Sequence, residues 1–173
     1  MSESEDTRSN VYAAPKADLE IIGDDAVLAE RKDRFLAAII DGVIGLLVGL
    51  PFVFLAGPYL GFDGLGSQPG YQYLIPATIF GFIMFVLIHG YLLSKYGQTV
   101  GKKVLKIKIV STEDEKVGLV KLLMLRYLPI SVATLVPIAG SFLPAADALF
   151  IFRKDRRCVH DLIAGTRVIK IRA

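Results

Sequence analysis

Apolar residues in this chain gather into long blocks, and charged residues occupy the segments between them. Residues 35–57 and 71–93 are two such blocks of about 23 residues each, enough for a helix to cross a bilayer core of ~30 Å. Tyr71 begins the second block and Tyr96 follows its end, as aromatic anchors do at membrane interfaces. The pattern predicts two transmembrane helices.

A third apolar region, residues 117–152, is too long for one span and short for two, and prolines interrupt it. A single span would carry the basic residues 153–157 to the outer side, whereas Lys and Arg concentrate on the cytoplasmic side. A hairpin of two short helices, residues 119–136 and 138–152, keeps them cytoplasmic. We therefore predict four spans with both termini cytoplasmic, and a re-entrant hairpin that does not cross fully is the alternative.

Two segments outside the spans alternate between apolar and basic residues with the period of a strand, residues 104–110 and 167–172. They predict a small cytoplasmic sheet. The expected fold class is an all-α membrane protein, a four-helix transmembrane bundle with a small cytoplasmic β element. Residues 27–173 would form the membrane domain. Residues 1–26 are polar, show no signal-peptide pattern, and predict a disordered cytoplasmic tail.

Composition mainly excludes other classes of protein. The chain is 53% hydrophobic and 21% charged, and its net charge of +3 is too modest and too clustered at block edges to indicate nucleic-acid binding. Cys158 is the one cysteine, which excludes an intramolecular disulfide and a cysteine-based zinc site. No metal or other cofactor is expected.

Charged residues inside the apolar blocks are the candidates for chemistry. Asp41 lies two helical turns after Arg34, so the two share a helix face. Arg126, Asp147 and His89 fall at a similar predicted depth, where an unpaired ion costs about 3 kcal/mol or more. We expect Asp41, Arg126 and Asp147 to form a cluster with Arg34 at its entrance. It either locks the bundle together or binds an ion or proton, and His89 is either an interfacial polar group or a proton-transfer group.

Two short motifs resemble catalytic sequences without meeting their requirements. Residues 97–103 (GQTVGKK) have three residues between the glycines of a phosphate loop instead of four, and they lack the Ser or Thr after the lysine. They predict a turn at the membrane surface. His160 and Asp161 have no nucleophile at a motif spacing, so we expect them to join the fourth helix to the last strand. The chain is not expected to be an enzyme.

A stripe of small residues runs along the first predicted helix, at Ala38, Gly42, Gly45 and Gly49. Small side chains at this spacing let another helix approach closely. That helix belongs either to the same chain or to a second copy in a homo-oligomer.

Several motifs, in this order, resemble the RDD family of bacterial membrane proteins: Arg34 to Asp41 (RFLAAIID), Gly97 to Lys102 (GQTVGK), Asp147, and His160 to Thr166 (HDLIAGT). The family is named for one arginine and two aspartates. Arg34 and Asp41 match the first two, and Asp147 and Asp161 both remain open for the third. The cytoplasmic motif positions are Gly97, Gln98, Thr99, Gly101, Lys102, His160, Asp161, Gly165 and Thr166.

The resemblance implies a multi-pass protein of the bacterial inner membrane that transports an ion or small solute. Some family members are linked to sodium/proton antiport, which implies cation/proton exchange through intramembrane Asp and Arg residues. The alternative is a non-transporting membrane scaffold or assembly module. The expected partners are the lipid bilayer, a small ion or solute, and a second copy of the chain.

Overall fold

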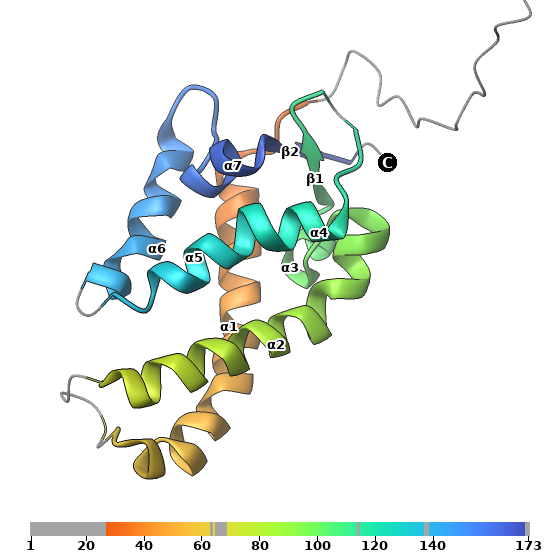
Figure 1. Ribbon diagram of the computed structural model, residues 1–173. Helices are drawn as coiled ribbons and strands as arrows, with labels where there is room; N and C mark the ends of the chain where they lie inside the picture. Colours follow the sequence, from red (N-terminus) through yellow and green to blue (C-terminus); the bar gives the residue numbers. More distant parts are fainter. Residues whose placement is uncertain (1–26, 63, 65–68, 114, 137–138, 172–173) are drawn as a thin grey trace, which may run out of the picture.

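The computed structural model describes residues 27–62, 64, 69–113, 115–136 and 139–171. The predicted tail, residues 1–26, lies outside these ranges. The two longest helices are α1 (Arg31–Ala56) and α2 (Tyr71–Tyr96) (Figure 1). The shorter elements are η1 (Pro58–Leu60), α3 (Val100–Val104), β1 (Ile107–Ser111), α4 (Leu119–Lys121), η2 (Leu122–Tyr127), α5 (Leu128–Ala133), α6 (Ala139–Leu149), η3 (Phe150–Phe152), α7 (Val159–Ala164) and β2 (Thr166–Lys170).

Helices α1 and α2 each have 26 residues and are long and apolar enough to cross a membrane. Their large apolar side chains point away from the protein: Phe54 is 74% exposed and Leu87 is 69% exposed. Such surfaces suit contact with hydrocarbon rather than water. The first two predicted spans are therefore present as helices, although α1 begins four residues earlier than the apolar block, at Arg31.

The third apolar region forms a hairpin of shorter helices. Helices α4, η2 and α5 follow one another without a gap from Leu119 to Ala133, and α6 then packs against α5. The first arm is roughly 22 Å long at 1.5 Å per residue, shorter than a bilayer core. Among the described residues, only α1 and α2 have the length and hydropathy of spans. We expected the hairpin to turn near residues 137–141; residues 137–138 lie outside the described ranges, and α6 already begins at Ala139.

The predicted small sheet is confirmed as two antiparallel strands, β1 and β2, with Ile107 opposite Lys170 and Ser111 opposite Thr166. Strand β1 starts three residues later than expected, because residues 100–104 coil into α3. The segment before α1 extends the far edge of β2 through a β-bridge between Leu28 and Ile169. The sheet therefore ties both ends of the described chain together.

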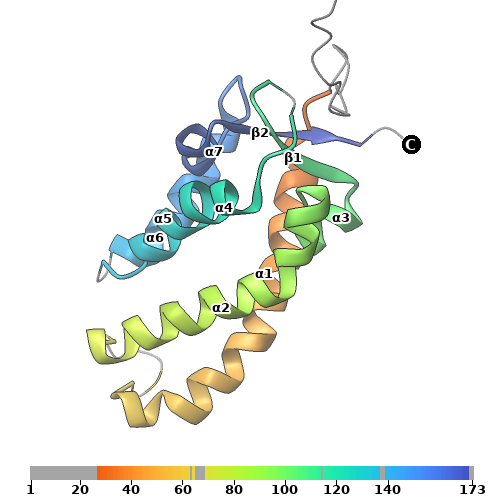
Figure 2. The same ribbon diagram turned by 45° about the vertical axis from the view of Figure 1, so that its right-hand side comes forward.

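The buried core lies where the sheet meets the helices. It contains Ala29, Ala37, Leu93, Ile107, Ile109, Val117, Leu122 and Val168. Figures 1 and 2 show the sheet, α3 and α7 gathered around the first half of α1, with η1 and the start of α2 at the far end. The packed core is thus confined to one end of the molecule, and the functional candidates lie at the boundary between this core and the long helices.

The small-residue stripe on α1 is open within the chain. A Cβ added to Gly42, Gly45 or Gly49 would meet nothing within 4 Å among the described atoms. The close approach expected from a helix of the same chain therefore does not occur at these glycines. Instead, Gly45 and Gly49 line a cavity between α1 and α2.

Candidate functional site

Asp41, in the first half of α1, faces the short segment that connects α2 to β1. Its Oδ2 accepts a hydrogen bond from the Thr99 hydroxyl at 2.5 Å, and its Oδ1 accepts one from the Gly101 backbone N–H at 2.8 Å. The Thr99 hydroxyl also caps α3, because it accepts from the Lys102 N–H at 3.4 Å. Asp41 thus fastens the start of α3 to α1.

Two glycines of the 97–102 motif make this approach of the backbone feasible. Gly97 ends α2 with a φ of +65°, a left-handed conformation that favours glycine, and its carbonyl accepts from the Ile109 N–H at 2.8 Å. A Cβ on Gly101 would overlap the Ala37 carbonyl oxygen and would lie 3.0 Å from Asp41 Oδ1. Glycine at position 101 therefore allows α3 to lie directly against α1.

His89, near the end of α2, contacts the same turn from the other side. It is 3% exposed, and its Nδ1 accepts a hydrogen bond from the Val100 N–H at 3.2 Å. Its ring lies against Phe85, with 4.8 Å between ring centroids. An imidazole that accepts at Nδ1 is neutral and carries its proton at Nε2. The start of α3 is therefore held by an acceptor from α1 and an acceptor from α2.

A cavity of about 270 Å³ lies between α1 and α2, and Asp41 and His89 are part of its lining. Both residues touch the start of α3, so they mark the same end of the cavity. The rest of the lining is apolar or aromatic, except for the hydroxyl of Tyr73. The cavity is thus an apolar space with its ionisable groups at one end.

Lys102 lies between this site and a second group of charges. Burial, and then the charge of Arg126, lower the pKa of Lys102 to about 8, and Arg34 acts in the same direction. The carboxylates of Asp41 and Asp161 oppose that shift. The Lys102 ammonium therefore interacts electrostatically with the charges around Asp41 and with those around Asp161. It forms no ion pair with any residue that the structure describes.

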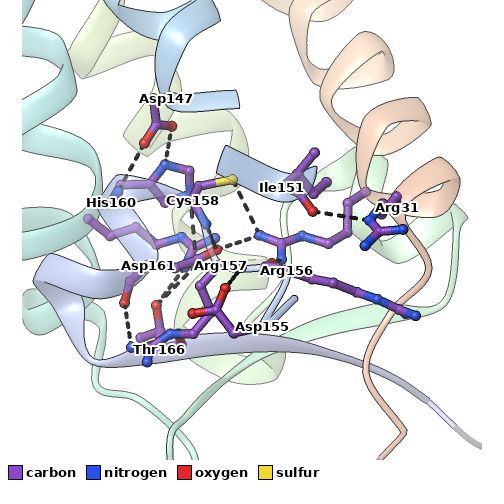
Figure 3. A network of polar contacts seen from close by, with 12 residues as sticks. Arg31, Asp147, Ile151, Asp155, Arg156, Arg157, Cys158, His160, Asp161 and Thr166 are labelled. Atoms are coloured by element: carbon purple, nitrogen blue, oxygen red, sulfur yellow. Dashed lines mark hydrogen bonds and ion pairs between the residues drawn. The ribbon is translucent and has the colours of Figure 1, made fainter. Parts of the chain in front are cut away.

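The second group is centred on Asp161 of α7, which is fully buried. Arg34 from α1 and Arg126 from η2 both donate to its carboxylate. The Cys158 N–H and the Thr166 hydroxyl add hydrogen bonds of 3.2 Å and 3.3 Å (Figure 3). One carboxylate thus joins three segments of the chain that are far apart in sequence.

The paired charges fix the protonation state of Asp161. Burial alone would raise its pKa, but the guanidinium groups of Arg126 and Arg34 outweigh burial and hold the pKa far below its usual range. Asp161 is therefore a carboxylate at any physiological pH. Its oxygens are occupied by protein donors, so its geometry suits a structural ion-pair cluster rather than exchange of a proton.

His160 connects Asp161 to Asp147 of α6. The Nδ1 of His160 lies 2.5 Å from Asp147 Oδ2, and its backbone N–H donates to Asp147 Oδ1 at 3.0 Å (Figure 3). Its Nε2 lies 3.8 Å from Asp161 Oδ1. Burial, and then the charge of Arg126, lower the pKa of His160, while both carboxylates oppose the shift. The ring is therefore neutral at neutral pH.

Three ligand-type atoms of Asp147, Cys158 and His160 lie within 4.8 Å of one another, a spacing that a metal ion could bridge. Burial raises the pKa of the Cys158 thiol to about 11, however, so the sulfur keeps its proton. The Sγ also accepts a hydrogen bond from Arg34 at 3.7 Å. A divalent cation would have to displace that proton beside a guanidinium, which makes the three residues a poor fit for a metal.

The expected cluster of Asp41, Arg126 and Asp147 does not form. Arg126 binds Asp161 instead, and so does Arg34, which was expected at the entrance to the cluster. The reason is that α7 packs against η2 and brings the Asp161 carboxylate to both guanidiniums. The five candidates are therefore divided between two separate sites.

Thr99 and Gly101 both bind Asp41, but the sequence alone did not indicate that either residue would contact it. The 97–102 segment was visible as a Gly-rich turn after the second apolar block, and such turns leave backbone N–H groups free to bind an anion. That signal indicates an acceptor nearby. It does not say which of the intramembrane carboxylates fills the role, because the choice depends on how α1 and α2 pack.

No curated protein and no solved structure matches the chain. Residues 28–165, from the segment before α1 to the end of α7, match the family model of the RDD family. This match covers most of the sequence and includes both charged sites. The chain therefore belongs to the RDD family, a family of bacterial membrane proteins.

Proposed function

We propose that this protein transports an ion or small solute across the bacterial inner membrane, and that Asp41 binds either the solute or a proton exchanged for it. The observation that carries the proposal is the set of partners of Asp41. Its carboxylate accepts from the neutral Thr99 hydroxyl and Gly101 N–H, and it lines the cavity between the two long helices. No basic side chain among the described residues forms an ion pair with it.

The contrast with Asp161 supports this choice. Two arginines neutralise the charge of a carboxylate and so lower its affinity for a proton or a cation. A carboxylate that is bound only by neutral donors keeps its affinity for both. Ionisable groups inside a membrane protein that face a cavity commonly mark the path of an ion or proton. We assign Asp41, with His89 beside it, to transport. Arg34, Arg126, Asp147 and Asp161 belong to the structural framework.

We further propose that both termini are cytoplasmic and that the α5–α6 hairpin crosses the membrane. The basic residues of α3, of the segment after α6 and of the start of α1 gather at the end of the molecule that holds the sheet (Figure 1). The positive-inside rule assigns such an end to the cytoplasm. In this orientation Asp41 lies near the cytoplasmic end of the cavity.

Sealed vesicles that contain the purified protein and an internal pH dye test the transport proposal. A sodium, lithium, potassium or methylammonium gradient should drive a proton flux through the wild-type protein. Asp41→Asn should abolish that flux while the protein stays folded, because the amide oxygen can still accept from the Gly101 N–H and the amide NH2 can donate to the Thr99 hydroxyl oxygen. The matched control is Asp155→Asn, which removes a carboxylate that pairs with Arg153 at 3.3 Å on the surface.

Two results would contradict the proposal. A folded Asp41→Asn protein that moves protons as fast as the wild type would remove Asp41 from the transport site. A wild-type protein that gives no flux with any of the four cations would argue against transport. That result would favour a membrane scaffold that assembles partners through its sheet.

A further inference from the structure

We infer that the cavity between α1 and α2 binds an amphipathic organic monocation, with its ammonium group at Asp41 and its apolar body against the apolar lining. This inference rests on the proposed function and narrows the substrate from cations in general to lipophilic amines. Three features of the cavity carry it: one charged end, an apolar wall, and space left by glycines.

The charged end offers an unfilled acceptor. A carboxylate has about four lone-pair sites on its two oxygens. Thr99 and Gly101 use two of the sites on Asp41, one on each oxygen. The other lone pairs of Asp41 remain unused, and Asp41 lines the cavity. A protonated amine in the cavity can therefore donate charge-assisted hydrogen bonds to them.

The wall suits an apolar, cationic body better than a bare alkali ion. Phe52 and Phe80 stack on each other across the two helices with 4.5 Å between ring centroids, and both line the cavity. Phe85, whose ring lies against His89, also lines the cavity near its charged end, and aromatic faces pack well against aromatic or aliphatic groups. Hard metal cations instead require several oxygen ligands. Among the described residues, the lining supplies only one side-chain oxygen beyond Asp41, the Tyr73 hydroxyl.

The space depends on glycine. Gly45 and Gly49 on α1 and Gly81 on α2 line the cavity, and a Cβ at any of them would meet nothing within 4 Å. At about 270 Å³ the cavity is close to the lower end of small-molecule sites, which run from roughly 300 Å³. It therefore suits a compact amine with one ring or a short chain. A lipid acyl chain would fill the apolar part and leave the carboxylate unpaired.

Equilibrium binding of radiolabelled phenethylamine to the protein in lipid nanodiscs tests the inference, with protein-free nanodiscs as the blank. We expect saturable binding at pH 7, where the amine is protonated. Asp41→Asn should weaken binding roughly tenfold or more, the loss of one ion pair. Uncharged 2-phenylethanol, which has the same ring and chain length, should fail to displace the amine.

Cavity-filling variants provide the matched comparison. Gly45→Leu and Gly81→Leu place a side chain in the cavity and should abolish binding. Gly42→Leu adds the same side chain to α1 one turn away, at a glycine that does not line the cavity, and should bind like the wild type.

Three outcomes would overturn the inference. The first is unchanged binding of phenethylamine to the Asp41→Asn protein. The second is displacement of the labelled amine by 2-phenylethanol as efficiently as by unlabelled amine; that result would indicate that the cavity takes an apolar molecule or a lipid. The third is absence of saturable binding. Binding is measured separately from flux, so vesicles that still exchange alkali cations in any of these cases would keep the proposed function and reject only the organic cation.

Discussion

Asp41 lies on α1 and Asp161 pairs with Arg34 of the same helix, but their partners give the two carboxylates opposite properties. Asp161 is fully buried between two guanidiniums and is committed to charge pairing. Asp41 is partly exposed and bound by neutral donors, so its charge remains available. The difference lies in the neighbours, because the residue type is the same. This contrast supports the proposal that Asp41 exchanges a proton or cation and that Asp161 stabilises the fold.

The role of Asp161 predicts a large loss of stability in Asp161→Asn. Removing its charge leaves Arg34 and Arg126 buried without a counter-ion, and breaking such a buried cluster costs about 3–5 kcal/mol. Thermal unfolding in detergent measures the loss. Asp155→Asn is the control, because its surface pair with Arg153 contributes at most about 1 kcal/mol. Equal melting temperatures for Asp161→Asn and the wild type would remove the cluster from the framework.

The pH dependence of the same two proteins gives a second measurement. The pKa of Asp161 is lower in the folded than in the unfolded chain, so its stabilisation is complete above the unfolded value of about 4. It is lost as the pH falls below that value. The wild-type melting temperature should therefore drop between pH 5 and pH 3 more steeply than that of Asp161→Asn. Parallel profiles would mean that Asp161 is not the titrating group.

Among the elements, α3 depends most on its surroundings. A five-residue helix is too short to be stable alone. Its cap comes from Thr99, and its first turn is held by Asp41 from α1 and His89 from α2. The element therefore exists only when α1 and α2 are correctly packed. A change of charge at Asp41 acts directly on this contact, which couples the site to the backbone between α2 and β1.

This dependence predicts that Gly101→Ala displaces α3. The added Cβ would overlap the Ala37 carbonyl oxygen, and overpacking of this kind costs about 1–3 kcal/mol. Hydrogen exchange of residues 99–104 should rise, and the melting temperature should fall. The matched control is Gly42→Ala, whose Cβ meets nothing within 4 Å and should cause no loss of stability. Unchanged exchange in Gly101→Ala would show that α3 has room for a side chain.

At the scale of the whole molecule, the structure has a packed end and an open end. The sheet, α3 and α7 surround the first half of α1 (Figure 2), and both long helices expose large apolar side chains, such as Phe54 and Leu87. This asymmetry fits a membrane protein whose polar framework lies at one face of the bilayer. The cavity lies between the two long helices, and its end at Asp41 and His89 adjoins the packed framework through α3.

The proposed topology predicts which engineered cysteines react with an impermeant thiol reagent in intact cells. On a Cys158→Ser background, Tyr59→Cys in the loop after α1 and Val136→Cys after α5 should be labelled from outside. Lys106→Cys beside the sheet should be labelled only after permeabilisation. External labelling of Lys106→Cys would reverse the orientation. An unreactive Val136→Cys would favour a re-entrant hairpin over two full spans.

The sequence by itself determined the elements whose signals are local. The length of the apolar blocks predicted α1 and α2, and the alternation of apolar and basic residues predicted β1 and β2. The motif order also identified the family before any geometry was known. These features could be read directly because helix length, strand period and motif spacing are properties of neighbouring residues.

The tertiary structure alone decided how the charges pair. Arg34 and Asp161 are separated by 127 positions and Arg126 and Asp161 by 35, so no local pattern links them. Depth along a predicted helix indicated that the intramembrane charges would need partners, but several aspartates met that requirement equally well. The choice was made by the packing of α7 against η2, which brought Asp161 to both arginines and left Asp41 facing the cavity.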